Sequence, residues 1–214
     1  MFVPAHFRPG PDLSTADIVC QYPLAILMSN GDDSTGPLAT HVPVIPESDP
    51  GEWPQDLAGA RLFTHMSRAN PHCSALHNGS VAVLAFTGPG AYVSPALYDT
   101  TEIAPTWDYV AVHARVVLER IEDRAHALDV MRRTVETLES RFGSGWDMSA
   151  ALNFFDKMLS AVEVFRATVL DAQGMFKLSQ EQPPRTFARV RDDFAARRST
   201  THQDVAALMK RTSR

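Results

Sequence analysis

Residues 109–121 read YVAVHARVVLERI, and residues 80–87 read SVAVLAFT. In the first stretch, apolar residues recur at every second position from Val110 to Leu118, with His113 and Arg115 among the residues between them. A period of two is typical of a β-strand whose two faces meet different surroundings. The second stretch is almost unbroken in apolar residues, as in a central strand covered on both faces. Both stretches therefore predict strands of a core sheet.

Further strands are predicted on either side of these two. The segments 23–28, 38–45, 60–66 and 162–170 are short and apolar or β-branched, and clusters of glycine, proline, asparagine and aspartate separate several of them. Gly88-Pro89-Gly90 follows the stretch 80–87 directly, and we interpret it as a hairpin turn that leads into another short strand at 91–94. The chain thus carries about six strands, most of them in its first half.

The helices are predicted late in the chain. Between residues 124 and 142, apolar side chains lie at positions 128, 131, 135, 138 and 142, a spacing that places them on one face of a helix. Shorter helices are expected at 149–159, 185–196 and 201–210. Strands at short intervals with helices added late predict a mainly β protein of the α+β class, built on a closed antiparallel barrel with C-terminal helices. A doubly wound α/β fold is excluded because the first half offers no helices between its strands.

Composition is that of an ordinary globular protein. The chain has 214 residues, 44% of them hydrophobic and 21% charged, so it is long enough to bury a core without disulfides. Its two cysteines, Cys20 and Cys73, are far apart and favour a reducing compartment. We see no secretory signal and no apolar run of membrane-spanning length, and we expect a cytoplasmic protein.

The net charge of −5 conceals a basic C-terminal segment. Residues 185–214 carry eight lysines and arginines against three aspartates, which leaves this segment at about +5 and the preceding residues at about −10. Such a segment can bind nucleic acid, or it can dock on an acidic surface of the same protein or of a partner subunit. No helix-turn-helix pattern or interleaved aromatic residues favour the first interpretation. Both stay open.

No strong catalytic or metal-binding signature is present. Gly88-Pro89-Gly90 lacks the third glycine of a dinucleotide-binding loop, and Ser94 lacks the flanking glycines of a nucleophile elbow. His72, Cys73 and His77 have a spacing that resembles a metal site, but no second cluster completes one. We therefore predict no metal and assign no catalytic residue.

Polar side chains within or next to the strands are the candidates for ligand binding. Buried polar groups need hydrogen-bond partners, and a bound polar ligand is one way to supply them. A guanidinium with nearby hydroxyl groups suits a phosphate, and flat aromatic rings suit the ring system of a flavin. For each residue alone, ordinary packing or hydrogen bonding explains the position equally well. The candidates are Thr40, His41, Thr64, His65, Ser67, Arg68, Asn70, Thr106, Trp107 and His113.

Five motifs in order along the chain resemble the landmarks of the PaiB family. They are THVP at 40–43, HMSRANP at 65–71, FTGPGAYVSP at 86–95, PTWDYVAVH at 105–113 and FKLSQ at 176–180, and the opening MFVPAHF is similar as well. Any one of these motifs is weak, whereas five in sequence order are rather specific. The resemblance covers residues 1–182 and extends more loosely to the end.

The resemblance implies an FMN-binding split β-barrel related to the pyridoxine-phosphate-oxidase-like superfamily. It implies a homodimer that holds the flavin at the subunit interface, with the candidates from Thr40 to Asn70 near the phosphate and ribityl chain and Thr106, Trp107 and His113 on the interface side. Residues 1–182 would form the FMN-binding domain and residues 183–214 a basic helical extension. The family is described as negative transcriptional regulators, so a flavin-linked regulator that contacts DNA through the basic segment is the leading hypothesis.

Two departures from the family pattern lie in the expected pocket. Asp108 stands where the family tends to have asparagine, and His72-Cys73 stands where it tends to have glutamine and tryptophan. These changes leave open a flavin-dependent oxidoreductase, in which His113, His65 or Asp108 handles protons. They also leave open a pocket that binds haem through a histidine, and a dimeric scaffold whose pocket no longer binds a ligand.

Overall fold

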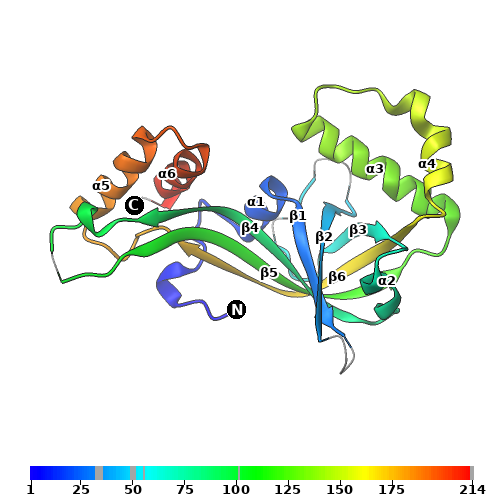
Figure 1. The fold of residues 1–214 in the computed structure, drawn as a ribbon, viewed down its shortest axis with the longest axis horizontal. Coiled ribbons are helices and arrows are strands. Elements are labelled where there is room, and N and C mark those ends of the chain that lie inside the picture. Colours follow the sequence, from blue (N-terminus) through cyan, green and yellow to red (C-terminus); the bar gives the residue numbers. More distant parts are fainter. Residues whose placement is uncertain (32–35, 49–51, 55, 101, 213–214) are drawn as a thin grey trace. The chain divides into compact units, whose positions relative to one another are not determined.

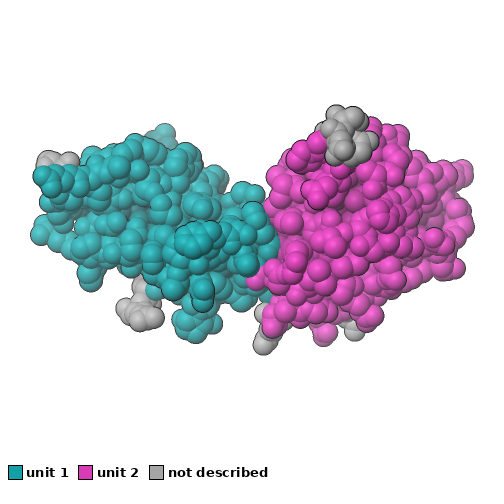
Figure 2. Space-filling model, turned by 90° about the horizontal axis from the view of Figure 1, so that it is seen from below, with its two compact units in different colours: residues 1–22, 86–113, 173–214 teal, residues 23–85, 114–172 magenta. Residues whose placement is uncertain are grey.

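The computed structural model describes residues 1–214 with the exception of 32–35, 49–51, 55, 101 and 213–214. The chain forms two compact units. Unit 1 comprises residues 1–22, 86–113 and 173–214, and unit 2 comprises residues 23–85 and 114–172 (Figure 2).

Six strands close into a barrel in the order β1-β2-β3-β6-β5-β4 (Figure 1). The β1–β2, β2–β3 and β3–β6 pairs are antiparallel. The predicted fold class, a mixed α+β protein built on an antiparallel barrel, is confirmed. The strands are β1 Leu24–Asn30, β2 Pro37–Pro46, β3 Arg61–Ser67, β4 Val81–Val93, β5 Thr106–Arg120 and β6 Val162–Lys177.

The predicted hairpin turn at residues 88–90 is wrong. Strand β4 continues through these residues without interruption. A Cβ atom on Gly88 would lie 3.1 Å from the carbonyl oxygen of Val110, and one on Gly90 would lie 3.2 Å from the Cβ of Tyr109. The two glycines therefore permit a close approach of the backbone to β5, which is the other common role of glycine within a strand.

Six α-helices and three short 3₁₀ turns complete the described part of the chain. The predicted long helix and the two basic helices are present, and the expected helix at 149–159 is a 3₁₀ turn followed by a short α-helix. Helices α1 and α2 were not predicted. The α-helices are α1 Thr15–Gln21, α2 Pro71–Ala75, α3 Arg124–Phe142, α4 Leu152–Met158, α5 Pro184–Ala196 and α6 Thr200–Thr212, and the 3₁₀ turns are η1 Ala5–Phe7, η2 Pro95–Leu97 and η3 Met148–Ala151. Within the described residues, none of the helices has the length and apolar character needed to cross a bilayer.

Unit 2 has apolar cores on both faces of its sheet. Alternation within the strands sends Ala25, Leu27 and Val42 to one face, where all three are fully buried. On the opposite face, Ile45 and Phe63 are register partners in β2 and β3 and pack against apolar residues of α3. Helix α3 thereby covers the outer face of the barrel wall, as its 3.6-residue spacing predicts.

Unit 1 brings the two C-terminal helices together with the first part of the chain. The apolar faces of α5 and α6 are buried, including Val190 and Phe194 of α5 and Leu208 and Met209 of α6. Several basic side chains of this segment contact acidic or carbonyl groups of unit 1. Arg189 pairs with Asp99 at 2.5 Å, and Arg211 donates to the carbonyl oxygen of Asp12 and to the carboxylate of Asp17, at 2.6 and 3.1 Å.

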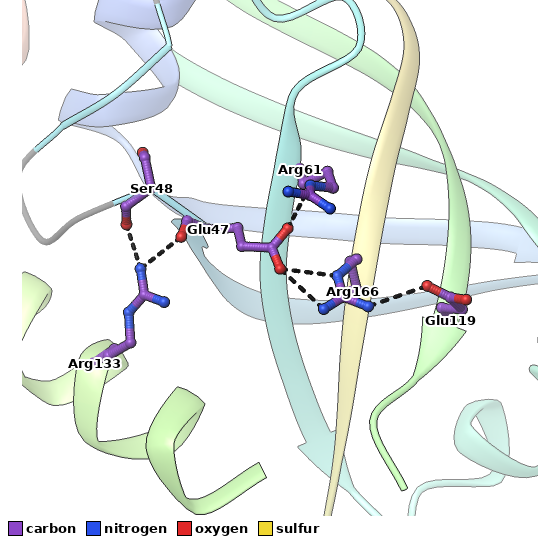
Figure 3. Close-up of polar contacts among 6 residues, drawn as sticks. All are labelled: Glu47, Ser48, Arg61, Glu119, Arg133 and Arg166. Carbon is purple, nitrogen blue, oxygen red and sulfur yellow. Dashed lines mark hydrogen bonds and ion pairs between the residues drawn. The ribbon is translucent and has the colours of Figure 1, made fainter. Parts of the chain in front are cut away.

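A network of charged residues joins three strands and α3 on the outer face of unit 2 (Figure 3). The Glu47 carboxylate lies between Arg61 of β3, at 2.7 Å, and Arg166 of β6, at 2.9 Å. Arg166 also reaches Glu119 of β5, at 3.2 Å. Arg133 of α3 donates to the backbone carbonyl groups of Glu47 and Ser48, and its guanidinium lies 5.6 Å from the centre of the Phe63 ring. The network links α3 to the barrel wall.

We expect Glu47→Gln to destabilise the protein by about 1–3 kcal/mol, because it removes the charge that Arg61 and the largely buried Arg166 share and leaves Arg166 only the longer contact with the exposed Glu119. Asp171→Asn is the matched control, since it breaks the well-exposed Arg115–Asp171 pair of unit 2 and should cost no more than about 0.5 kcal/mol. Chemical denaturation of both variants measures the difference. Equal stabilities would show that the Glu47 network contributes nothing.

Candidate functional site

The predicted site residues divide between the two units. Thr40, His41, Thr64, His65, Ser67, Arg68 and Asn70 lie in unit 2, and Thr106, Trp107 and His113 lie in unit 1. The two groups are therefore treated as separate sets.

Alternation along the strands separates neighbouring candidates in unit 2. Thr40 and Thr64 lie on the inner face of the barrel wall, whereas His41, His65 and Ser67 lie on the outer face. Thr64 is only 2% exposed, and its hydroxyl donates to the carbonyl oxygen of Pro43 at 2.8 Å. Its side chain is thus engaged within the fold. His41 and Ser67, by contrast, are exposed.

A hydrogen-bonded cluster forms where α2 meets the inner face of β1 and β2. Asn70 caps α2 by accepting from the backbone N–H of His72 at 3.0 Å, and its side-chain amide donates to the Thr40 hydroxyl at 3.1 Å. The imidazole of His72, 2% exposed, bridges the hydroxyl groups of Thr40 and Ser29, at 2.9 and 3.0 Å. Two predicted site residues, distant in sequence, are thus joined through a histidine that was not on the candidate list.

His65 occupies the outer face of β3 beside Val164 of β6. Its Nδ1 atom is buried and has no hydrogen-bond partner among the described residues. Burial lowers the pKa of this imidazole, so the neutral form prevails at neutral pH. An unpaired buried nitrogen of this kind is usually satisfied by an internal water molecule.

Arg68 belongs to an ion cluster at the end of the barrel. The carboxylate of Glu163, 3% exposed, accepts from Arg68 at 2.5 Å and from Arg120 at 3.0 Å. Arg120 also donates to the carbonyl oxygens of Cys73 and Leu76, at 2.9 and 2.7 Å, and so fixes α2. Because one carboxylate faces two guanidinium groups, this cluster carries a net positive charge. The side chain of Arg68 is about half exposed and can meet an anion.

A cavity of about 330 Å³ opens beside Arg68. Two of its walls, Val162 and Val164, are the β6 register partners of Ser67 and His65. The cavity therefore adjoins the outer-face candidates of β3. Its volume is at the lower end for small-molecule pockets, enough for part of a cofactor-sized ligand. The remaining lining residues are Ile121, Glu122, Arg124, Ala127, Leu159 and Ser160.

The candidates of unit 1 lie along β5. The Thr106 hydroxyl is hydrogen-bonded to the ammonium group of Lys177, which lies 5.9 Å from the centre of the Phe7 ring. Trp107 is 56% exposed and contacts the edge of Tyr92, with 6.2 Å between ring centres. Burial lowers the pKa of His113. Trp107 thus offers a free aromatic face, whereas Thr106 is already paired.

Asp108 is the most perturbed carboxyl group in unit 1. It is fully buried, and its Oδ2 accepts from the Ser179 hydroxyl at 2.7 Å, while its Oδ1 has no partner among the described residues. Ser179 itself adopts a left-handed conformation, with φ of +58°. Burial raises the pKa of Asp108 to about 7, and the Ser179 hydrogen bond only partly offsets this effect. The Asp108 carboxyl group therefore titrates near neutral pH and not in the acidic range of an ordinary aspartate.

Several residues of this region carried no usable signal in the sequence. Glu163 and Arg120 are ordinary charged residues of strand segments, and only the folded register brings them to Arg68. His72 was noted as a departure from the family pattern, although its bridging role depends on a helix that was not predicted. No group of three potential metal ligands occurs among the described residues.

Comparison with known proteins gives one family and several relatives. A family model described as "Putative FMN-binding domain" matches residues 1–171. The protease synthase and sporulation protein PAI 2 of Bacillus subtilis is 25% identical over 179 residues, which cover 81% of this chain and 80% of that protein. An uncharacterized protein of Saccharomyces cerevisiae is 31% identical over 134 residues, 53% of this chain and 75% of that protein.

Solved structures support the fold. A conserved hypothetical protein from Mycobacterium tuberculosis aligns with a TM-score of 0.55 and 15% identity, over 86% of this chain and 94% of that one. A FAD and haem binding protein from Mycobacterium smegmatis aligns with a TM-score of 0.50 and 18% identity, over 76% and 69%. At these identities, the likeness concerns the fold alone.

Asp108→Asn should change how stability depends on pH. Between the ordinary carboxyl pKa and about 7, the folded state holds a proton that the unfolded state has lost, so the native protein loses stability as pH rises through this window. The variant lacks this loss. Its stability relative to the native protein should therefore be about 2–3 kcal/mol more favourable at pH 8 than at pH 5. Denaturation at both pH values tests this expectation, and a difference independent of pH would contradict it.

Proposed function

This chain belongs to the family of FMN-binding domains that matches residues 1–171, and from this premise we propose that it binds FMN through unit 2, at the end of the barrel beside α2. The predicted PaiB-type resemblance agrees with the match to PAI 2. The observation that carries the proposal is the half-exposed guanidinium-bearing residue Arg68 beside an open cavity that it lines.

The phosphate would be held by Arg68. Its partner Glu163 is also neutralised by Arg120, so Arg68 can turn one face of its guanidinium to a phosphate while the carboxylate keeps a partner. Ser67 and His65 project from the outer face of β3, whereas Arg68 reaches Glu163 on the inner side. Ser67, at the strand end directly before Arg68, is therefore the residue that would offer a hydroxyl to the ribityl chain. These residue types fit a phosphorylated polyol.

The ring system would need a second surface, and we propose that a second copy of the chain supplies it. A cavity of about 330 Å³ accommodates only part of a molecule the size of FMN. Trp107 and Tyr92 of unit 1 present exposed aromatic rings that suit stacking. The homodimer is thus the assembly in which both candidate sets can serve one ligand, and light scattering of the purified protein measures it.

We favour a redox use of the bound flavin. When bound, FMN supplies hydride or electron transfer, and the protein supplies orientation and proton handling. Neutral His65 can accept a proton and later return it from the imidazolium form, because burial lowers its pKa and keeps the ring unprotonated at neutral pH. Oxidation of reduced nicotinamide by the flavin-loaded protein tests this use.

A flavin-linked transcriptional regulator is the second candidate, favoured by the basic C-terminal segment and by the sporulation role in the name of PAI 2. Part of that charge is neutralised within unit 1, because Arg189 pairs with Asp99 and Arg211 with Asp17. Titration with promoter DNA at several salt concentrations separates the two candidates. A regulator would show binding that weakens steeply as salt increases.

Haem is the minor alternative ligand. Exposed His41 offers a ring nitrogen that could bind iron from the outer face of β2. The absorption spectrum of the freshly purified protein distinguishes flavin bands from a Soret band.

Arg68→Ala should weaken FMN binding by about 10- to 100-fold, the loss expected for one charge-assisted contact of 1.5–3 kcal/mol. Quenching of flavin fluorescence measures the affinity. Riboflavin, which lacks the phosphate, should bind the variant and the native protein nearly equally. Arg115→Ala is the matched control, since Arg115 is an exposed arginine of unit 2 outside the site. Unchanged FMN affinity in Arg68→Ala would remove Arg68 from the site.

A further inference from the structure

The hydrogen bonds of the cluster beside α2 must each run from one donor to one acceptor. The members of this cluster are Ser29, Thr40, Asn70 and His72. The orientation of the Asn70 amide is fixed by its capping role. Its oxygen accepts from the backbone N–H of His72, so its NH₂ group is the donor to the Thr40 hydroxyl. Thr40 Oγ1 therefore accepts one hydrogen bond from Asn70.

Two arrangements of the His72 proton are compatible with these contacts. A neutral imidazole carries its hydrogen on one ring nitrogen and accepts on the other. If Nε2 carries the hydrogen, His72 donates to Ser29 at 3.0 Å and accepts from the Thr40 hydroxyl at 2.9 Å. If Nδ1 carries it, both contacts reverse.

Only the first arrangement gives the imidazole N–H and both hydroxyl groups an acceptor among the described residues. In it, Asn70 donates to Thr40, Thr40 donates to His72, His72 donates to Ser29, and Ser29 donates to the carbonyl oxygen of Asn30 at 3.3 Å. In the reverse arrangement, Thr40 accepts from both Asn70 and His72, and its own hydroxyl hydrogen has no acceptor in this cluster. Half-buried polar groups favour the arrangement in which all donors are satisfied.

We propose that His72, in its Nε2–H form, fixes Thr40 as a hydrogen-bond acceptor and so determines which part of the ligand Thr40 meets. The Thr40 oxygen has one lone pair left and no free hydrogen. It can therefore meet a donor group, such as a ribityl hydroxyl or a ring N–H, but not a phosphate oxygen, which only accepts. This inference rests on the proposed binding of FMN for the identity of the ligand, and it moves Thr40 away from the phosphate.

The proton position is tested without any ligand. Two-bond proton–nitrogen correlation spectra of the full chain labelled with ¹⁵N-histidine distinguish the two neutral forms. The chain has eight histidines, and the loss of one signal in His72→Gln identifies His72. We expect the Nε2–H pattern at neutral pH. An Nδ1–H pattern would overturn the inference whether or not the protein binds flavin.

The ligand contact is tested with two flavins. Thr40→Val keeps the shape of the side chain and removes its oxygen, so it should weaken FMN and riboflavin binding by the same factor, about 5- to 10-fold. A loss of affinity for FMN without a matching loss for riboflavin would show that Thr40 meets the phosphate and would overturn the inference. Thr40→Ser keeps the hydroxyl and serves as the matched control, and the melting temperature of each variant verifies folding.

Restoration by a conservative variant separates orientation from packing. His72→Gln can still accept from Thr40 through its amide oxygen and donate to Ser29 through its NH₂, so it should keep flavin affinity within about twofold of the native protein. His72→Leu fills similar space without these bonds and should bind both flavins more weakly. Equal affinities in the two variants would overturn the role of His72. If the native protein binds neither flavin, the proposed function fails, and so does the assignment of Thr40 to a flavin. The position of the His72 proton is measured independently of that result.

Discussion

The architecture of unit 2 depends on one buried carboxylate at the end of the barrel. Glu163 is almost completely excluded from solvent, and an isolated carboxylate in such a place would be strongly unfavourable. Arg68 and Arg120 both donate to it, and Arg120 extends the contact to the backbone of α2. Arg120, which neutralises the Glu163 carboxylate, thus also fixes the position of α2. Helix α2 in turn places His72 against Thr40. The contacts that stabilise unit 2 are thus also those on which the proposed ligand site depends.

The parts of the structure that the sequence could predict are those with a local pattern. The barrel could be predicted because residues 109–121 show a period of two in the sequence itself and the other strand segments are short and apolar or β-branched. Helix α3 could be predicted from the spacing of its apolar residues, which places them on one face of a helix. The turn expected at Gly88-Pro89-Gly90 was wrong because glycine serves tight turns and close backbone approach alike, and only the neighbouring β5 distinguishes the two. Helix α1 has a capping box between Ser14 and Asp17 that could have identified its start.

The candidate site was predictable as a set of residue types but not as a set of contacts. Thr40 and His41 are adjacent in sequence, and so are Thr64 and His65, yet each pair is divided between the two faces of the wall. The alternation of side chains along a strand predicts this division, even though both residues of each pair belong to the same sequence motif. The contacts with Glu163, Arg120 and Lys177 depend on strand pairing between distant segments, for which the sequence offers no local signal.

The buried acid of unit 1 has a thermodynamic consequence beyond stability. Near pH 6, folded protein keeps the Asp108 proton and unfolded protein releases it to the solution, because burial raises the pKa of the group to about 7. Heat absorbed during melting then includes the enthalpy with which the buffer takes up that proton. Calorimetric enthalpies recorded in phosphate and in an amine buffer would therefore differ for this chain, and the size of the difference would count the protons that the native fold retains.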